Sequence, residues 1–341
     1  MHSEYAIDIE YVAKTYKNLF RAGVPALRGV EMKVHRGEIF GLLGPNGAGK
    51  STLVKILMTV IRASSCKGSM LGAPIGDKST LARVGYLPEH HTFPPYLTSI
   101  QLIEFFGAMT NVTRRDRKRR SRELLELVGM GDWGNKKIGS YSKGMRQRVG
   151  IAQTLINDPD LILLDEPTDG VDPVGRRDIR EILERLGEQG KTIFINSHLL
   201  SELEQVSSRV AIIVKGLVAQ QGTIDELTKD DEHYEIQIQP HSPPTTDPAT
   251  DAPQPDLPKL AENAIEGRHE ITQTGDTLRI ATADPAQIQP IIDRFRAQGV
   301  VIQSIRSARP SLEDLFMKAV IDPDTGQALT PGADRTKKGS A

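Results

Sequence analysis

One nine-residue segment constrains the fold of this chain more than any other. Residues 44–52 read GPNGAGKST and match the pattern G-x-x-x-x-G-K-[ST]. A short apolar run before them predicts a buried strand, and an apolar-periodic run after them predicts a helix. The glycines let consecutive backbone N–H groups turn toward a phosphate chain, while the helix N-terminus adds its partial positive charge. The sequence therefore predicts a site for a nucleoside triphosphate.

The side chains of this loop have separate expected tasks. Lys50 would reach the outer phosphates, and the Ser51 hydroxyl would ligate Mg²⁺. A glycine-rich turn that binds nothing is the alternative, and the complete spacing with its flanking strand and helix disfavours it. The predicted nucleotide-contacting residues of the loop are Gly44, Pro45, Asn46, Gly47, Ala48, Gly49, Lys50, Ser51 and Thr52.

Composition narrows the class of protein. The chain has 341 residues, a net charge of −1 and 26% charged residues, which argues against a strongly basic nucleic-acid binder. Its single cysteine, Cys66, excludes an intrachain disulfide framework and fits a reducing compartment. No run approaches 18 apolar residues, and the N-terminus lacks a signal-peptide pattern. We therefore expect a cytoplasmic protein that is long enough for two domains.

Two alternating segments precede the loop. Residues 5–12 and 30–34 alternate apolar and polar side chains, which predicts an antiparallel sheet ahead of the phosphate loop. Tyr16 lies between them. It is either a packing residue or an aromatic platform for the nucleotide base, and we favour stacking because it requires only an exposed ring face.

The segment after the first helix is predicted to be largely helical. Residues 84–89 indicate a strand that ends in a proline-stopped loop, and Thr98 with Gln101 forms a capping-box pattern for the next helix. Residues 114–122 then contain seven basic residues in nine. Such a run is either a patch for nucleic acid or lipid headgroups, or the solvated face of an amphipathic helix. We favour the solvated face, because an apolar-periodic segment follows directly.

Two carboxylates follow a second buried strand. Four apolar residues, 161–164, are typical of a strand buried on both faces, and Asp165 and Glu166 come at its end. Unpaired acids would be costly to bury there, so Mg²⁺ and an attacking water account for them. A further apolar strand, residues 192–197, delivers His198 to the same edge of the sheet.

Taken together, these motifs resemble those of the ATP-binding subunits of ABC transporters, in order over residues 4–225. The resemblance implies an α/β P-loop NTPase core with a parallel sheet, an N-terminal antiparallel β subdomain and an α-helical subdomain at about 90–150. The core domain would span residues 4–228. The matching positions are the phosphate loop, the Q-loop residue Glu89, the signature Ser142-Lys143-Gly144-Met145, the Walker B residues Asp165 and Glu166, the D-loop residue Asp172 and the switch residue His198.

The resemblance also implies a mechanism. Two subunits would form a head-to-tail dimer with two ATP molecules between them, and Ser142, Lys143 and Gly144 of one chain would face the nucleotide of the other. Glu166 would be the general base, His198 would contact the γ-phosphate, and Lys50 would complete the catalytic set. The implied Mg²⁺ ligands are Ser51, Glu89 and Asp165.

Two positions depart from the usual family pattern. Glu89 replaces a glutamine, and a carboxylate about 4 Å from a phosphate charge is repelled by about 4 kcal/mol at an effective dielectric constant of 20. Lys143 replaces a common glycine and adds a cation that would offset Glu89. Both variants resemble those of bacterial exporter subunits that serve drug-, polysaccharide- or lipid-type permeases.

The C-terminal part has a different composition. Residues 229–321 predict the order β-α-β-β-α-β-α, a small α+β ferredoxin-like domain whose last strand spans residues 300–306. Residues 241–256 are rich in Pro, Thr and Asp and predict a disordered insert, and residues 322–341 predict a disordered tail.

The expected function is ATP hydrolysis that powers export by a separate membrane permease, docked through the helical segment after Glu89. The subunit would lie on the inner face of the membrane, as a homodimer or paired with another ATPase subunit, with no nucleic-acid partner. The alternatives are a soluble ATPase of this superfamily in translation or DNA repair, and a P-loop kinase. One ATPase unit without heptads disfavours the former, and the signature and His198 disfavour the latter.

Overall fold

The computed structural model describes residues 4–18, 21–228, 233–239, 257–262, 264, 271–282, 284–309 and 311–320. The chain divides into two compact units. The first unit comprises Met1–Ile224 with Phe316–Ala341, and the second comprises Asp225–Leu315. The predicted insert at 241–256 and the predicted tail at 322–341 lie outside the described residues.

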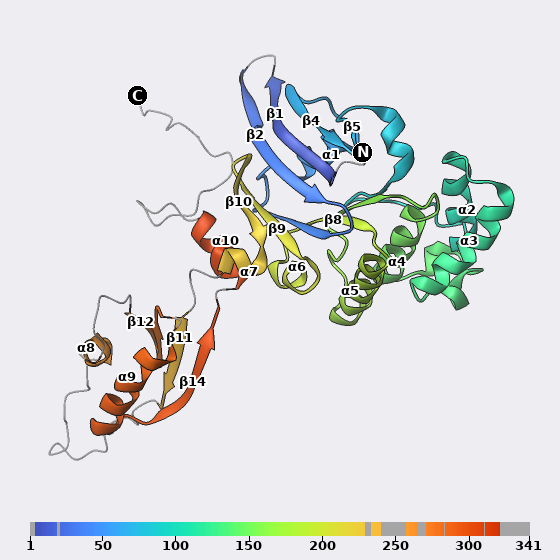
Figure 1. The fold of residues 1–341 in the computed structure, drawn as a ribbon. Helices are drawn as coiled ribbons and strands as arrows, with labels where there is room; N and C mark the ends of the chain where they lie inside the picture. The colour runs from blue at the N-terminus through green and yellow to red at the C-terminus, as the bar shows by residue number, and fades with distance from the viewer. Residues whose placement is uncertain are drawn as a thin grey trace, which may run out of the picture. The chain divides into compact units, whose positions relative to one another are not determined.

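A six-stranded sheet forms the centre of the first unit (Figure 1). Its order is β10-β9-β3-β8-β7-β6, and all neighbours are parallel except β9 and β10. Every residue of β7 and β8 is buried, as expected for parallel strands covered on both faces. The strands are β3 (Ile39–Leu43), β6 (Val84–Leu87), β7 (Leu161–Asp165), β8 (Thr192–Ser197), β9 (Arg209–Val214) and β10 (Leu217–Thr223).

Helices cover this sheet with their apolar faces. The phosphate loop leads directly into α1, and α4, α5 and α6 lie beside the sheet in Figure 1. Within the core the rings of Phe40 and Phe194 stack with centroids 5.7 Å apart, which fixes β3 against β8. The helices are α1 (Lys50–Leu57), α4 (Lys143–Thr154), α5 (Pro173–Glu188) and α6 (Leu200–Val206).

The predicted antiparallel sheet is present: β1 and β2 precede the phosphate loop, and two further strands, β4 and β5, join them from the segment after α1. Its order is β2-β1-β4-β5, and its inward side chains, among them Ile7, Ile9 and Val12, are fully buried. They join the same core cluster as Leu53 and Leu57 of α1, so this sheet supports the helix that begins at the loop. The strands are β1 (Tyr5–Asn18), β2 (Arg21–His35), β4 (Ser65–Met70) and β5 (Ala73–Pro74).

The segment after β6 is helical, as predicted. It contains α2 (Ser99–Met109) and α3 (Arg114–Leu127), and the capping box of Thr98 and Gln101 forms at the start of α2. The Tyr141 hydroxyl ties the loops between α3 and α4 together, because it donates to the Trp133 carbonyl at 2.6 Å and reaches Ser99 Oγ at 3.1 Å. The described residues of this unit also form short 3₁₀ helices at Lys78–Arg83, Gly131–Trp133 and Ile138–Ser140.

The second unit has the predicted element order and a ferredoxin-like sheet, β12-β13-β11-β14, with antiparallel neighbours. Its last strand begins at Ile302, two residues later than the sequence predicts. Glu235, on the sheet's central strand, is buried and pairs with Arg279 and Arg306. The elements are α7 (Ile224–Thr228, at the unit boundary), β11 (His233–Ile238), α8 (Leu257–Glu262), β12 (Ile271–Thr274), β13 (Thr277–Ile280), α9 (Pro285–Ala297), β14 (Ile302–Ala308) and α10 (Leu312–Val320, which crosses the boundary).

In the part of the chain that the structure describes, no helix is both long enough and apolar enough to cross a membrane.

Candidate functional site

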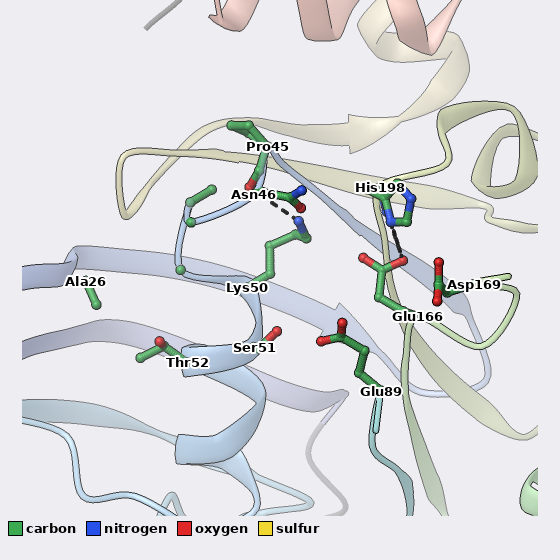
Figure 2. Close-up of a pocket in the computed structure, with 13 residues that line it drawn as sticks. Ala26, Pro45, Asn46, Lys50, Ser51, Thr52, Glu89, Glu166, Asp169 and His198 are labelled. Atoms are coloured by element: carbon green, nitrogen blue, oxygen red, sulfur yellow. Dashed lines mark hydrogen bonds and ion pairs between the residues drawn. The ribbon is translucent and has the colours of Figure 1, made fainter. Parts of the chain in front are cut away.

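The candidate site lies where four neighbouring parallel strands end. The loops after β3, β6, β7 and β8 leave the carboxyl edge of the sheet together, which is where open α/β sheets bind ligands. A cavity of about 500 Å³ opens there (Figure 2). It is lined by Ala26, Pro45, Asn46, Gly47, Ala48, Gly49, Lys50, Ser51, Thr52, Glu89, Glu166, Asp169 and His198.

The phosphate loop has the backbone shape that its sequence predicts. Gly49 has a φ of 112°, a conformation that L side chains rarely adopt. A Cβ at this position would lie 2.6 Å from the Ala26 carbonyl oxygen, so only glycine fits. Among the described residues no side chain caps α1, so its first N–H groups remain available to an anion.

Lys50 is held by the loop itself. Its Nζ donates to the Gly44 carbonyl at 2.6 Å and lies 3.4 Å from the Pro45 carbonyl oxygen. Burial lowers the pKa of Lys50, while the negative charges of Glu166 and Asp165 raise it. A phosphate chain in the cavity would offer the ammonium stronger, charged acceptors than these carbonyls.

Glu166 is fixed in a strained backbone conformation at the end of β7. Its φ is 52°, which is uncommon for a residue with a side chain, and its backbone N–H donates to the Asn196 carbonyl at 2.8 Å. The carboxylate Oε2 accepts from the backbone N–H of His198 at 3.2 Å and lies 2.7 Å from its Nδ1 (Figure 2). Two strand ends therefore position one carboxylate at the cavity wall.

Asp165 is buried beside Asn196, its register partner on β8, and accepts a short hydrogen bond from the Asn196 amide. The pKa of Asp165 is raised to about 6 in all: burial raises it most, the amide hydrogen bond lowers it, and the nearby charges of Glu89 and Glu166 raise it. Sequence reasoning missed Asn196. The available signal was a single amide within an otherwise apolar strand, just before its end.

The oxygen donors near the loop suit a hard cation. Ser51 and Glu89 both line the cavity, and Figure 2 shows the Glu89 carboxylate directed toward Ser51. Within the described ranges no group of three His, Cys, Asp or Glu side chains forms a cation cage. Magnesium bound with a nucleotide uses only one or two carboxylates plus phosphate oxygens and waters, so the hydroxyl and carboxylates present fit it.

Five residues predicted to contact the nucleotide, and the predicted magnesium ligand Asp165, do not line the cavity. One of the five is Gly44, whose carbonyl accepts the Lys50 hydrogen bond. Tyr16, on β1, is 43% exposed, and the Lys14 ammonium lies 5.1 Å from its ring centroid. The ring is accessible but does not line the cavity, so its stacking on a nucleotide base stays a prediction. Ser142 caps α4 by accepting from the Met145 N–H at 3.2 Å. Lys143 and Gly144 follow in the first turn of that helix.

Lys143 has a partner that the sequence did not indicate. Its Nζ lies 2.9 Å from Asp169 Oδ2, and Asp169 lines the cavity. The Lys143 ammonium lowers the pKa of Asp169 by hydrogen bonding. About half of each side chain is exposed, so the pair stabilises the fold little, by about 0.2–1 kcal/mol. Its effect is to hold the start of α4 against the loop after β7 within one chain.

The raised pKa of Asp165 predicts how stability depends on pH. Folding raises this pKa from 3.8 to about 6, so the folded state binds the proton more tightly and the ionised carboxylate costs stability. The cost is complete above about pH 6 and disappears as the pH falls toward the unfolded value. Asp165→Asn should therefore stabilise the ligand-free protein by about 3 kcal/mol at pH 7.5 and by about half of that at pH 5.

Urea unfolding of both proteins at the two pH values measures this difference. The asparagine keeps the acceptor for the Asn196 amide, so the comparison isolates the charge. An equal stabilisation by Asp165→Asn at pH 5 and pH 7.5 would contradict the raised pKa assigned to Asp165.

Comparisons with known proteins agree with this geometry. A family model described as ABC transporter matches residues 27–169, and one described as ATP-binding protein DrrA1-3-like, C-terminal domain, matches residues 253–320. An uncharacterized ABC transporter ATP-binding protein of Synechocystis sp. is 40% identical over 313 residues, which cover 90% of this chain and 82% of that protein. The Nod factor export ATP-binding protein I of Rhizobium sp. is 32% identical over 318 residues, 93% of this chain and 97% of that protein.

Solved structures match the fold of the first unit. A dimeric post-hydrolysis state of an ATP-binding cassette bound to ADP and Pi aligns with a TM-score of 0.58 and 25% identity. The alignment covers 64% of this chain and 98% of that chain.

Proposed function

Because this chain belongs to the ABC transporter family, as an ATP-binding subunit that hydrolyses ATP, we propose that its ATPase cycle powers export through a separate membrane permease. One observation carries the proposal: a carboxylate held by a histidine faces the cavity that the phosphate loop lines. The direction is proposed from the relative that is named for Nod factor export and from the DrrA-like C-terminal domain.

In this proposal the loop binds the phosphates and Glu166 activates water. The free N–H groups of α1 receive the phosphate oxygens, and Lys50 exchanges its loop carbonyls for the outer phosphates. Glu166 accepts the proton of the attacking water, while His198 fixes the direction of the carboxylate and contacts the γ-phosphate.

Ser51, Glu89 and Asp165 would hold Mg²⁺. Bound there with the nucleotide, the ion neutralises phosphate charge. The chain's own contribution is to keep Asp165 ionised through the Asn196 amide and to bring the Glu89 oxygens beside the hydroxyl of Ser51. Glu89, a glutamine in most of the family, then supplies an anionic ligand rather than a repulsive charge.

The active assembly would contain two ATPase units. Ser142, Lys143 and Gly144 do not line the cavity of their own chain, which supports a head-to-tail dimer in which they face the nucleotide of the other subunit. The matched cassette is likewise named as dimeric. On dimerisation the Lys143 ammonium would exchange Asp169 for the γ-phosphate of the nucleotide bound to the other subunit. That other subunit would be a second copy of this chain or a paired ATPase subunit.

A pull-down tests the function. Tagged Glu166→Gln protein would be captured from detergent-solubilised membranes of its native host with ATP and Mg²⁺, and its partners identified by mass spectrometry. We expect a stoichiometric protein with several membrane spans, docked through the helical segment after Glu89. The double variant Lys50→Ala/Glu166→Gln is the matched control for effects that require bound ATP.

Ribosomal or DNA-processing partners without a membrane protein would contradict the transport assignment. They would support the alternative, a soluble ATPase of this family that acts in translation or DNA repair. Stimulation of the ATPase rate by RNA or DNA ends would point the same way.

A further inference from the structure

The helix α3 carries the most concentrated charge of the described chain. Its fourteen residues, RRDRKRRSRELLEL, contain seven basic and three acidic side chains, whereas the whole chain has a net charge of −1. The apolar face of α3 is packed, with Ser121, Leu124 and Leu125 buried. Every fully exposed side chain of the helix is charged.

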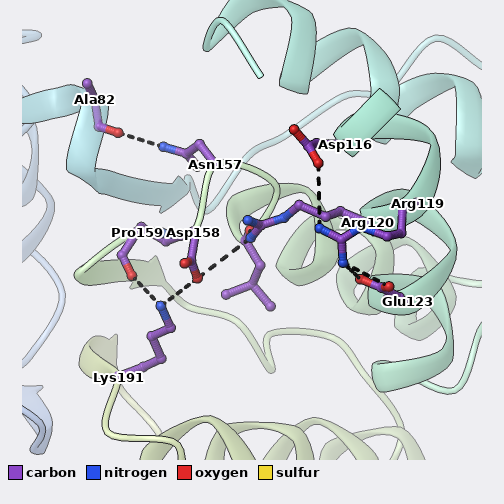
Figure 3. A network of polar contacts seen from close by, with 10 residues as sticks. Ala82, Asp116, Arg119, Arg120, Glu123, Asn157, Asp158, Pro159 and Lys191 are labelled. Atoms are coloured by element: carbon purple, nitrogen blue, oxygen red, sulfur yellow. Dashed lines mark hydrogen bonds and ion pairs between the residues drawn. The ribbon is translucent and has the colours of Figure 1, made fainter. Parts of the chain in front are cut away.

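Three of the basic residues have structural partners inside the first unit. The Arg117 guanidinium donates to the Val112 carbonyl at 2.9 Å. Arg119 forms ion pairs with Glu123 at 2.9 Å and with Asp116 at 3.7 Å, along its own helix (Figure 3).

Arg120 points the other way, into the junction between α3 and the central sheet. It donates to the Leu155 carbonyl at 2.9 Å and lies 3.6 Å from Asp158, which also pairs with Lys191 at 2.8 Å (Figure 3). These contacts join α3 to the loop before β7 and to the start of β8. These contacts within the chain explain the position of the Arg120 side chain without a partner from another molecule.

The remaining cations form one exposed stripe. Arg115, Lys118 and Arg122 follow the spacing i, i+3 and i+7, which places them on one face of a helix over roughly 10 Å. All three are exposed, and within the part of the chain that the structure describes none forms an ion pair or a side-chain hydrogen bond. The charge of Arg115 lowers the pKa of Asp116 through space. Arg114, which is also exposed, extends the stripe at the start of the helix.

We propose that this stripe, Arg115, Lys118 and Arg122, binds the anionic headgroups of phospholipids at the membrane surface beside the permease. The location rests on the proposed function, since a subunit docked on a permease works next to that surface. The chemistry rests on charge complementarity: each Lys or Arg near an anionic bilayer strengthens binding by about fivefold. The exposed face has no apolar side chain, so the contact is electrostatic, without insertion.

The stripe fits a lipid surface better than a nucleic acid. Proteins that bind single strands combine basic residues with aromatic platforms for the bases, and the exposed face of α3 has no aromatic residue. Long, flexible cationic side chains on one helix face match a flat surface of mobile charges, which requires no fixed register.

A vesicle sedimentation experiment with the full chain tests the inference. The wild type should bind vesicles in which a third of the phosphatidylcholine is replaced by phosphatidylglycerol, should not bind pure phosphatidylcholine, and should dissociate at high salt. The triple variant Arg115→Glu, Lys118→Glu, Arg122→Glu should lose at least about a hundredfold in affinity.

The matched control is Lys78→Glu, Arg185→Glu, Lys215→Glu, which makes the same charge change at three exposed positions elsewhere in the first unit. It should keep vesicle binding. Equal loss in the two triple variants would show that only net charge matters and would overturn the proposal, as would unchanged binding by the stripe variant.

Two further readouts separate lipid from other partners. Inorganic phosphate at matched ionic strength should not displace the protein from the vesicles; displacement would indicate a site for free phosphate instead.

The stripe variant should also keep wild-type ATPase activity and capture the permease in detergent. Loss of that capture would assign the stripe to a protein contact and overturn the proposal. Failed vesicle binding alone would leave the transport function intact, because the vesicles contain no permease.

Discussion

Replacing Glu166 with glutamine is expected to slow ATP hydrolysis by about 10²–10⁴-fold while ATP binding persists. The amide keeps the size of the side chain and can still accept a hydrogen bond from His198, but it cannot accept a proton from water. The phosphate loop is unchanged, so the nucleotide remains bound. The two subunits should therefore accumulate as an ATP-bound dimer that does not reset.

Phosphate release, equilibrium nucleotide binding and size-exclusion chromatography with ATP and Mg²⁺ together measure this result. Glu204→Gln on α6 is a matched control, because Glu204 is exposed and lies outside the cavity. Turnover close to the wild-type rate in Glu166→Gln would remove this residue from the role of general base.

The second large effect is expected for Gly49→Ala, which should abolish detectable ATP binding. The new methyl group would have to occupy space 2.6 Å from the Ala26 carbonyl oxygen, at a φ of 112°. The loop must shift to relieve this contact, and the N–H groups at the start of α1 then no longer converge on a phosphate chain. A measurable loss of folding stability should accompany the change.

Gly190→Ala provides the control for backbone strain alone. Gly190 also has a positive φ, 78°, but a Cβ there would meet nothing within 4 Å. This variant should lose about 1 kcal/mol of stability and keep its affinity for ATP. Calorimetric titration with ATP and urea unfolding of both variants make the comparison, and retained binding by Gly49→Ala would contradict the role assigned to the loop.

The sequence predicted most of the architecture because the signals for it are local. Continuous apolar runs marked β7 and β8 as buried strands, and alternation marked the first part of β1 and the last part of β2. The capping box at Thr98 marked the start of α2 to the residue. The residues at which strands begin and end were predicted less accurately, as β14 shows, because few residues near a strand end favour one boundary strongly.

Contacts across the fold were not predictable in this way. Periodicity shows which face of an element is buried, but it does not show which side chain will lie opposite. The pairing of Lys143 with Asp169 joins residues 26 positions apart, and the bond from Asn196 to Asp165 joins residues 31 positions apart. Both depend on the order of strands and loops at the edge of the sheet.

The same limit applies to Tyr16 and to the basic run of α3. The sequence placed Tyr16 between two predicted strands, and only the structure shows that it belongs to β1 and that its ring lies outside the cavity wall. Composition showed seven basic residues, yet only packing separates Arg120, which donates to the Leu155 carbonyl, from Lys118, whose side chain has no partner among the described residues.

The sequence by itself determined that this chain binds a nucleotide, because the phosphate loop uses consecutive backbone N–H groups and one helix end, all within nine residues. Only the tertiary structure decided how the catalytic carboxylate is held. Glu166 and His198 are 32 residues apart, and their contact exists because β7 and β8 are parallel neighbours that end at the same level of the sheet. Hydrogen bonding between distant strands, rather than local propensity, sets that geometry.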